Sequence, residues 1–156
     1  MRTLVPRLLA GIALTLSPAC SDDNSSPLPA APEGYPYAYA TNGCGPTDGP
    51  ATRVFLAADS SDDMPPQVAR LEFVIYRSAA DLQGEEVSWS GSTNEAWAGR
   101  CPATGACDVA SFAQVTFREN AADTLLSGTL VMRFQDGTSV SGGFDATWRR
   151  TLQLCG

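Results

Sequence analysis

The sequence predicts an all-β fold, an antiparallel β-sandwich of about 7–8 short strands, and three observations favour this fold class. Apolar and polar side chains alternate in short runs, which is typical of strands with one buried face. Turn sequences rich in Gly, Pro, Asp and Asn separate these runs. After residue 20, no segment has the apolar stripe of an amphipathic helix.

Seven segments are expected to form the strands of this domain, and they span residues 53–58, 68–77, 86–90, 95–100, 109–118, 125–135 and 138–148. The sequence "SAADL" at 78–82 is compatible with a single helical turn. We expect "YPYAYA" at 35–40 to be a first strand that docks on the domain. Alternatively, the alternation places Tyr35, Tyr37 and Tyr39 in a stripe that stacks against a sugar.

The sharpest local prediction is a hairpin around Asp136-Gly137. A three-residue loop of Gln135, Asp136 and Gly137 places Phe134 opposite Thr138, and carries all the large apolar side chains of both strands to one face. These are Leu126, Leu130, Met132, Phe134, Val140, Phe144, Ala146 and Trp148. A two-residue loop would shift the register and mix apolar with polar side chains across the pair. We therefore expect the longer loop, with Gly137 at positive φ.

The first 20 residues have the layout of a secretory signal. Arg2 and Arg7 supply the positive start, and the uncharged segment Leu8–Leu16 follows them. This apolar segment is about half as long as the roughly 20 residues that a membrane-spanning helix needs. The pattern therefore favours a cleaved signal over a permanent membrane span.

The end of this signal, "SPAC" at Ser17–Cys20, resembles the lipobox of bacterial lipoproteins. The resemblance implies cleavage before Cys20 and attachment of a diacylglycerol to its thiol. Ala19 fits the pattern, whereas Ser17 departs from it, because Leu is usual three places before the cysteine. Ser21 replaces the aspartate that often signals inner-membrane retention, which favours the outer membrane. The alternative is ordinary secretion, with cleavage near Ala19 and Cys20 left as a thiol.

We expect the chain to divide into a signal peptide at 1–19, a tether at 20–42 and one β-sandwich domain at 43–156. The tether is rich in Pro, Ser and Asp, and Leu28 is its only large aliphatic side chain. Such a segment buries too little apolar surface to fold. As a flexible coil it would hold the domain about 25 Å from the lipid on average.

The cysteine count favours disulfides beside the lipid anchor. The chain has five cysteines, and assigning Cys20 to lipid leaves an even number, for which three pairings exist. Cys101 and Cys107 bracket "PATGA", a turn-forming sequence, so we expect them to pair with each other. Cys44 and Cys155 would then join the two ends of the domain. A zinc site is disfavoured, because histidines and zinc-type spacing are both missing.

The composition excludes several kinds of chemistry. The chain has no histidine and no lysine, so the commonest general base and Schiff-base chemistry are unavailable. No serine lies in a G-x-S-x-G sequence, and "SGGF" at 141–144 indicates close packing or a bulge rather than a phosphate loop. We expect no cofactor. Asp59, Asp62 and Asp63 in "DSSDD" form a weak calcium candidate on ligand type alone.

The net charge limits the partners. Loss of Arg2 and Arg7 with the signal leaves 8 arginines against 17 acidic residues, a net charge of −9. Such a surface repels phosphates, which argues against nucleic acid and leaves the lipid as the contact with the membrane. The sequence thus predicts a lipid-anchored envelope protein whose noncatalytic β-domain has a binding or structural role toward an unknown envelope or extracellular ligand. The alternative is an envelope hydrolase that uses carboxylates or calcium, which requires acids that converge in a pocket.

Overall fold

The structure, a computed structural model, describes residues 26–119 and 125–149. Within these residues the fold is all-β, as predicted, and "SAADL" contains the expected turn as the 3₁₀ helix η2 (Ala80–Leu82). No helix in these ranges has the length and hydropathy needed to cross a membrane. The strands are β1 (Tyr37–Cys44), β2 (Pro50–Ala57), β3 (Arg70–Ile75), β4 (Glu86–Trp89), β5 (Ala96–Cys101), β6 (Asp108–Val109), β7 (Phe112–Phe117), β8 (Leu125–Arg133) and β9 (Ser139–Trp148).

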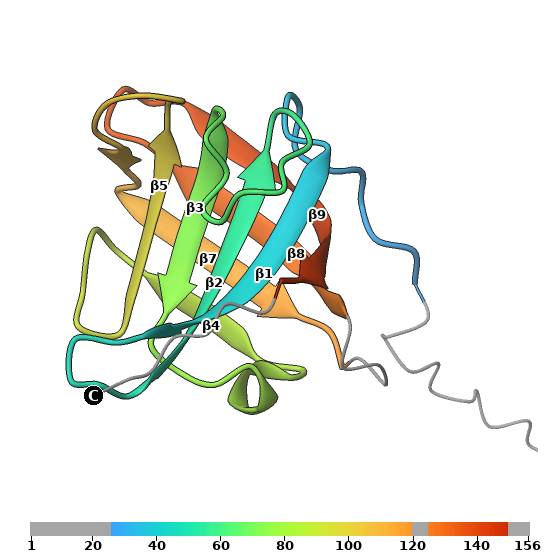
Figure 1. Ribbon diagram of the computed structural model, residues 1–156, viewed down its shortest axis with the longest axis vertical. Coiled ribbons are helices and arrows are strands. Elements are labelled where there is room, and N and C mark those ends of the chain that lie inside the picture. Colours follow the sequence, from blue (N-terminus) through green and yellow to red (C-terminus); the bar gives the residue numbers. More distant parts are fainter. Residues whose placement is uncertain (1–25, 120–124, 150–156) are drawn as a thin grey trace, which may run out of the picture.

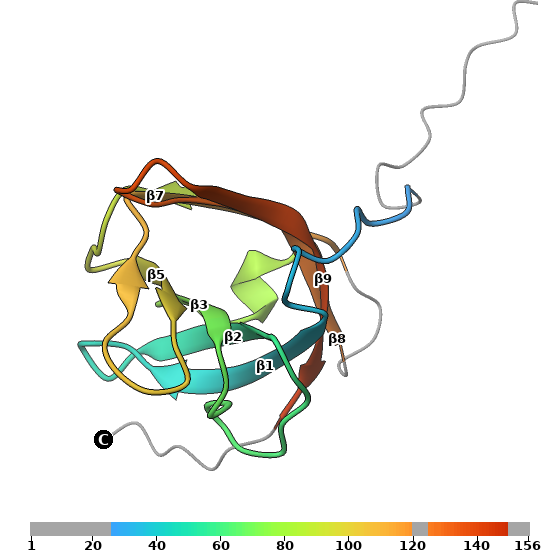
Figure 2. The same ribbon diagram turned by 90° about the horizontal axis from the view of Figure 1, so that it is seen from above.

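The strands form one curled sheet in the order β4-β7-β8-β9-β1-β2-β3-β5-β6 (Figures 1 and 2). The sheet is mixed, because β1 and β9 are parallel while the other neighbours are antiparallel. The predicted antiparallel sandwich is therefore corrected to a nine-stranded half-barrel. Alternation along a strand shows only which face is buried, and a curled sheet buries its concave face as effectively as two sheets bury their facing sides.

A continuous stretch of chain links the two distant parts of this sheet. β6 pairs with β5, and only two residues later β7 begins and pairs with β8. Between them, the Ala110 amide donates to the Ala98 carbonyl at 3.0 Å and the Ser111 amide donates to the Arg133 carbonyl at 2.8 Å. This crossing draws the two parts of the sheet around a shared interior.

The core fills the concave side of the sheet. Phe73, Phe117 and Phe144 meet edge to face at its centre, with ring centroids between 5.7 and 6.3 Å apart. This offset geometry is the favourable one for aromatic pairs. Leu82 of η2 is fully buried in the same core. Strands far apart in the sequence are thus held together by one apolar cluster.

The β8–β9 hairpin has the predicted register. Met132 pairs with Val140, and the Phe134 amide donates to the Thr138 carbonyl at 2.9 Å. Gly137 has φ +82°, as the three-residue loop requires. All eight apolar residues predicted for the inner face are in or against the core cluster. The prediction is confirmed.

β1 begins at Tyr37 and lies in the middle of the sheet, so the predicted boundary at residue 43 falls inside this strand. The expected docking strand in "YPYAYA" is thereby confirmed, whereas the single tyrosine stripe is not. Tyr35 packs against the main core, Tyr37 is 42% exposed, and Tyr39 is buried with Phe55 on the outer face.

Residues 26–36, which we call the strap, were expected within a flexible tether but lie against the sheet beside β9 (Figure 2). The strap contains four prolines, which cannot donate backbone hydrogen bonds, and its composition is therefore typical of a coil. Its carbonyls still accept hydrogen bonds from the sheet, and its side chains still pack.

Candidate functional site

We call the boundary between β1 and β9, which are parallel neighbours in the sheet, the seam. Among the described residues, the two strands pair at Tyr39 with Thr147 and at Ala40 with Trp148. The Arg149 amide adds one more hydrogen bond, to the Ala40 carbonyl at 2.8 Å. Towards Gly142 and Gly143, β9 hydrogen-bonds with the strap instead of with β1.

The strap fits into this seam because β9 has two consecutive glycines there. The Gly143 amide donates to the Ala30 carbonyl at 2.9 Å. A Cβ atom on Gly143 would lie 2.3 Å from the Pro29 carbonyl oxygen, and one on Gly142 would lie 2.6 Å from the Pro32 nitrogen. Only glycine allows so close a backbone approach. The close packing expected of "SGGF" is confirmed, and the strap is its partner.

Two further hydrogen bonds fix the course of the strap. The Arg118 guanidinium donates to the Ser26 carbonyl at 2.5 Å, where the described part of the strap begins. The Tyr35 amide donates to the Pro32 carbonyl at 3.0 Å and closes a turn before β1. Gly34 lies inside this turn with φ +83°, a conformation that glycine adopts without strain.

Between the strap and the sheet is a half-open crevice of about 180 Å³. Its exposed wall is polar and apolar in equal parts, and its lining residues come equally from both sides. The strap supplies Leu28, Pro29, Ala31, Tyr35 and Pro36, and the sheet supplies Ala38, Leu56, Gly143, Phe144 and Asp145. Among the described lining residues Asp145 alone is charged, and its Oδ1 atom accepts a hydrogen bond from the Ser127 hydroxyl.

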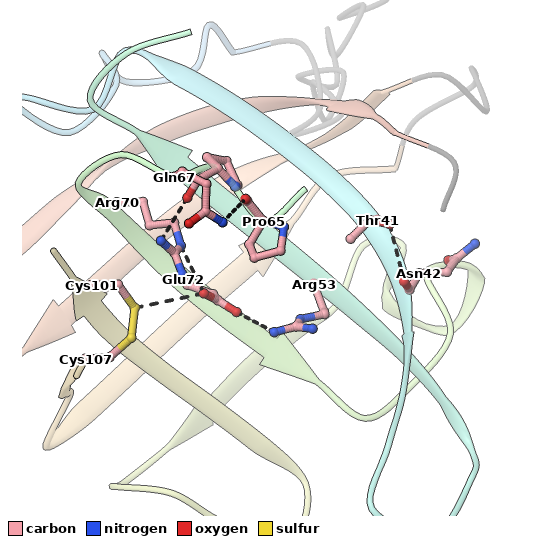
Figure 3. Close-up of polar contacts among 10 residues, drawn as sticks. Thr41, Asn42, Arg53, Pro65, Gln67, Arg70, Glu72, Cys101 and Cys107 are labelled. Atoms are coloured by element: carbon pink, nitrogen blue, oxygen red, sulfur yellow. Dashed lines mark hydrogen bonds and ion pairs between the residues drawn. A yellow bond between two sulfur atoms is a disulfide. The ribbon is translucent and has the colours of Figure 1, made fainter. Parts of the chain in front are cut away.

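A buried carboxylate lies on the opposite, convex face of the sheet (Figure 3). Glu72 on β3 is 3% exposed, and its two oxygens bind Arg53 Nη2 at 2.7 Å and Arg70 Nε at 3.2 Å. Arg70 also donates to the Pro66 carbonyl at 2.9 Å, which fastens the loop between β2 and β3. With both oxygens engaged and little solvent access, this cluster is suited to holding the loop rather than to proton transfer.

Sequence reasoning missed this cluster because its members come from different strands. Arg53 and Glu72 are 19 residues apart, and the antiparallel pairing of β2 with β3 makes them diagonal neighbours. The only local signal is the spacing of two between Arg70 and Glu72, which places both on one face of β3.

Cys101 and Cys107 form the expected disulfide, with Cα atoms 4.1 Å apart. Cys101 Sγ lies 3.9 Å from Glu72 Oε2, so the disulfide borders the buried carboxylate (Figure 3). Cys44 is the last residue of β1. Its predicted partner Cys155 and the lipidation site Cys20 lie outside the described residues, so both assignments stay predictions.

The calcium candidates do not converge. Asp59, Asp62 and Asp63 are all exposed, and Asp59 accepts a hydrogen bond from the Ser60 amide at 2.8 Å. Only Asp62 lines a neighbouring hollow of about 120 Å³, together with Tyr39, Ser60, Ser61 and Arg149. In the described ranges, no three Asp, Glu, Cys or His residues are arranged to hold a metal ion.

A carboxylate in the β8–β9 turn has a lowered pKa. Asp136 accepts hydrogen bonds from the Thr138 hydroxyl at 2.6 Å, the Thr138 amide at 2.9 Å and Arg100 at 3.1 Å. Thr138 first, and Arg100 after it, lower the pKa of Asp136 from 3.8 to about 2. Arg100 also lies 4.4 Å from the centre of the Phe134 ring. These contacts fix the turn, and they keep Asp136 an acceptor rather than an acid.

No family model, curated protein sequence or solved structure matches this chain. The case for function therefore depends on the strap, the crevice and the N-terminal sequence.

Proposed function

We propose that this chain is a lipid-anchored protein of the bacterial cell envelope, more specifically of the outer membrane, whose noncatalytic β-domain is a binding module. The observation that carries the proposal is that the strap, which begins six residues after Cys20, is part of the domain itself. The strap occupies the seam between β1 and β9 and supplies half of the crevice wall. The anchor sequence is thus followed along the chain by the strap, which forms one side of the candidate binding site.

The strap sets how far the domain can lie from its anchor. Ser26 already touches Arg118 of the domain, and it follows Cys20 by six residues. Six extended residues reach about 20 Å at most, so the domain would lie close to the membrane. This upper limit is shorter than the average distance expected for a free tether ending at residue 42.

The alternative, an envelope hydrolase, gains no support from the described acids. Carboxylate chemistry needs two acids that face one substrate, or a metal ion that they hold together. Glu72 is engaged by two arginines, and Asp136 is fixed in its turn. The acids of the 59–63 loop are exposed, and no three acids among the described residues are arranged to hold a metal ion. We therefore do not propose a second function.

The test of the anchor is mass spectrometry of the mature N-terminus, together with acyl labelling and membrane fractionation. The wild type should begin at an acylated Cys20, and Cys20→Ser should lose the label and leave the membrane fraction. Ser21→Ala is the matched control and should label like the wild type. Ser21→Asp should label normally but collect in the inner membrane. An unmodified native N-terminus would show that the anchor is wrong.

A further inference from the structure

The crevice has the size and the walls for one flat ring. Its volume of about 180 Å³ compares with the roughly 150 Å³ of an engineered protein cavity that binds benzene. Tyr35, Phe144, Pro29 and Pro36 are among the residues that line it. Leu56 and Phe144 belong to the main core, so an occupant of the crevice would contact the core directly. Because the exposed wall is half polar, a ring that carries a polar group suits this space.

Charge at the rim defines the other end of such a ligand. Asp145 is the charged residue among those described in the lining, and its Oδ1 is oriented by the Ser127 hydroxyl. A carboxylate has a second oxygen, which can receive a donor from a ligand. Aromatic faces also attract cations, and Tyr35 is the partly buried aromatic residue of the lining. The Asp145 carboxylate and the Tyr35 ring together favour a cationic group and disfavour an anionic one.

We infer that the crevice between the strap and the sheet is a binding site for a small ligand that joins a flat apolar ring to a cationic amine. The strap supplies half of the wall, so the site is complete only while the strap is docked. A ligand that binds the docked state stabilises it by mass action. Occupancy of the crevice would therefore be coupled to docking of the segment that leads to Cys20.

This inference rests on the proposed binding role but not on lipid attachment, so the two can fail separately. The binding test uses the purified full mature chain and measures chemical shifts and heats of binding with three probes. Benzylamine carries ring and cation, benzyl alcohol carries the ring alone, and benzoate carries the ring with the wrong charge. We expect benzylamine to bind most tightly and benzoate to show no binding.

Variants locate the binding. Asp145→Asn should lower the affinity for benzylamine about fivefold, which corresponds to the loss of a partly exposed ion pair. Its affinity should then equal that for benzyl alcohol. Ala31→Phe, which fills the crevice from an exposed strap position, should abolish binding of both. Asp62→Asn changes a residue of the other hollow, which Tyr39 and Arg149 also line, and this control should bind benzylamine like the wild type.

The coupling to the strap has its own measurement. Benzylamine should slow hydrogen exchange at the Gly143 amide, which donates to Ala30 of the strap. The site assignment is overturned if benzylamine does not bind at millimolar concentration, if benzoate binds as tightly, or if Asp62→Asn weakens binding as much as Asp145→Asn. Binding without slower exchange at Gly143 would overturn the coupling. None of these results bears on acylation of Cys20.

Discussion

Replacing Gly143 with alanine tests whether the strap is an integral part of the domain. The added Cβ atom would lie 2.3 Å from the Pro29 carbonyl oxygen and 3.2 Å from Leu28 Cβ. Both are closer than ordinary van der Waals contact, and a backbone carbonyl cannot rotate away as a side chain does. The strap must therefore shift or leave the seam.

The expected cost follows from these contacts. Overpacking typically costs about 1–3 kcal/mol, and loss of the hydrogen bond between the Gly143 amide and the Ala30 carbonyl adds about 1 kcal/mol. The chain can limit the strain by releasing the strap, so the docking free energy of the strap sets an upper bound. We expect Gly143→Ala to lower the free energy of unfolding by about 2 kcal/mol.

Two other glycines serve as controls, measured by urea unfolding. Gly137→Ala meets nothing within 4 Å but has φ +82°, so its cost of about 1 kcal/mol comes from backbone strain alone. Gly49→Ala has open space and no positive φ, so it should remain within about 0.5 kcal/mol of the wild type. Hydrogen exchange at residue 143 should rise only in Gly143→Ala. The strap account is refuted if Gly143→Ala is as stable as Gly49→Ala and its residue-143 amide stays protected.

Three further predictions concern the rest of the molecule. Glu72→Gln should lower the free energy of unfolding by about 3 kcal/mol, because Arg53 and Arg70 would face a neutral amide in a buried site. Arg100→Ala breaks exposed ion pairs and should lower it by less than about 1 kcal/mol. Equal losses in urea unfolding would contradict the role assigned to Glu72. The lowered pKa of Asp136 means that its stabilising contribution is present above the ordinary pKa of 3.8 and is lost as the pH falls towards about 2. In an NMR titration Thr138→Val should raise this pKa more than Arg100→Ala does, and the reverse order would contradict the assigned cause. Nonreducing peptide mapping should link Cys101 with Cys107 and Cys44 with Cys155, and a Cys44–Cys101 peptide would be incompatible with this pairing.

Local features of the chain were predictable from the sequence, because they depend on residues close to one another along it. The alternation of apolar and polar side chains located most strands, since a strand with one buried face has a period of two. The β8–β9 register followed for the same reason, because a slip of one residue would expose Phe134 and Met132. The Cys101–Cys107 disulfide closes a short turn-forming loop, so its partners were close in any fold.

The tertiary structure alone decided how these elements assemble. Alternation is the same in a sandwich and in a curled sheet, so it could not distinguish them. The parallel pairing of β1 with β9 joins Tyr39 to Thr147, and no pattern within either strand specifies that partner. The ion pairs of Glu72 likewise depend on which strand lies beside β3.

The strap shows the physical reason most clearly. Its prolines and small residues carry the composition of a coil, and the glycine pair of β9 looks like an interruption in a strand. The two features are explained by their contact, because the missing side chains of Gly142 and Gly143 provide the space that the strap backbone fills. The sequence by itself determined the strands, the hairpin and the proposed anchor sequence. The seam, the crevice and the place of Asp145 within it arise from contacts between segments more than 100 residues apart, which only the folded chain brings together.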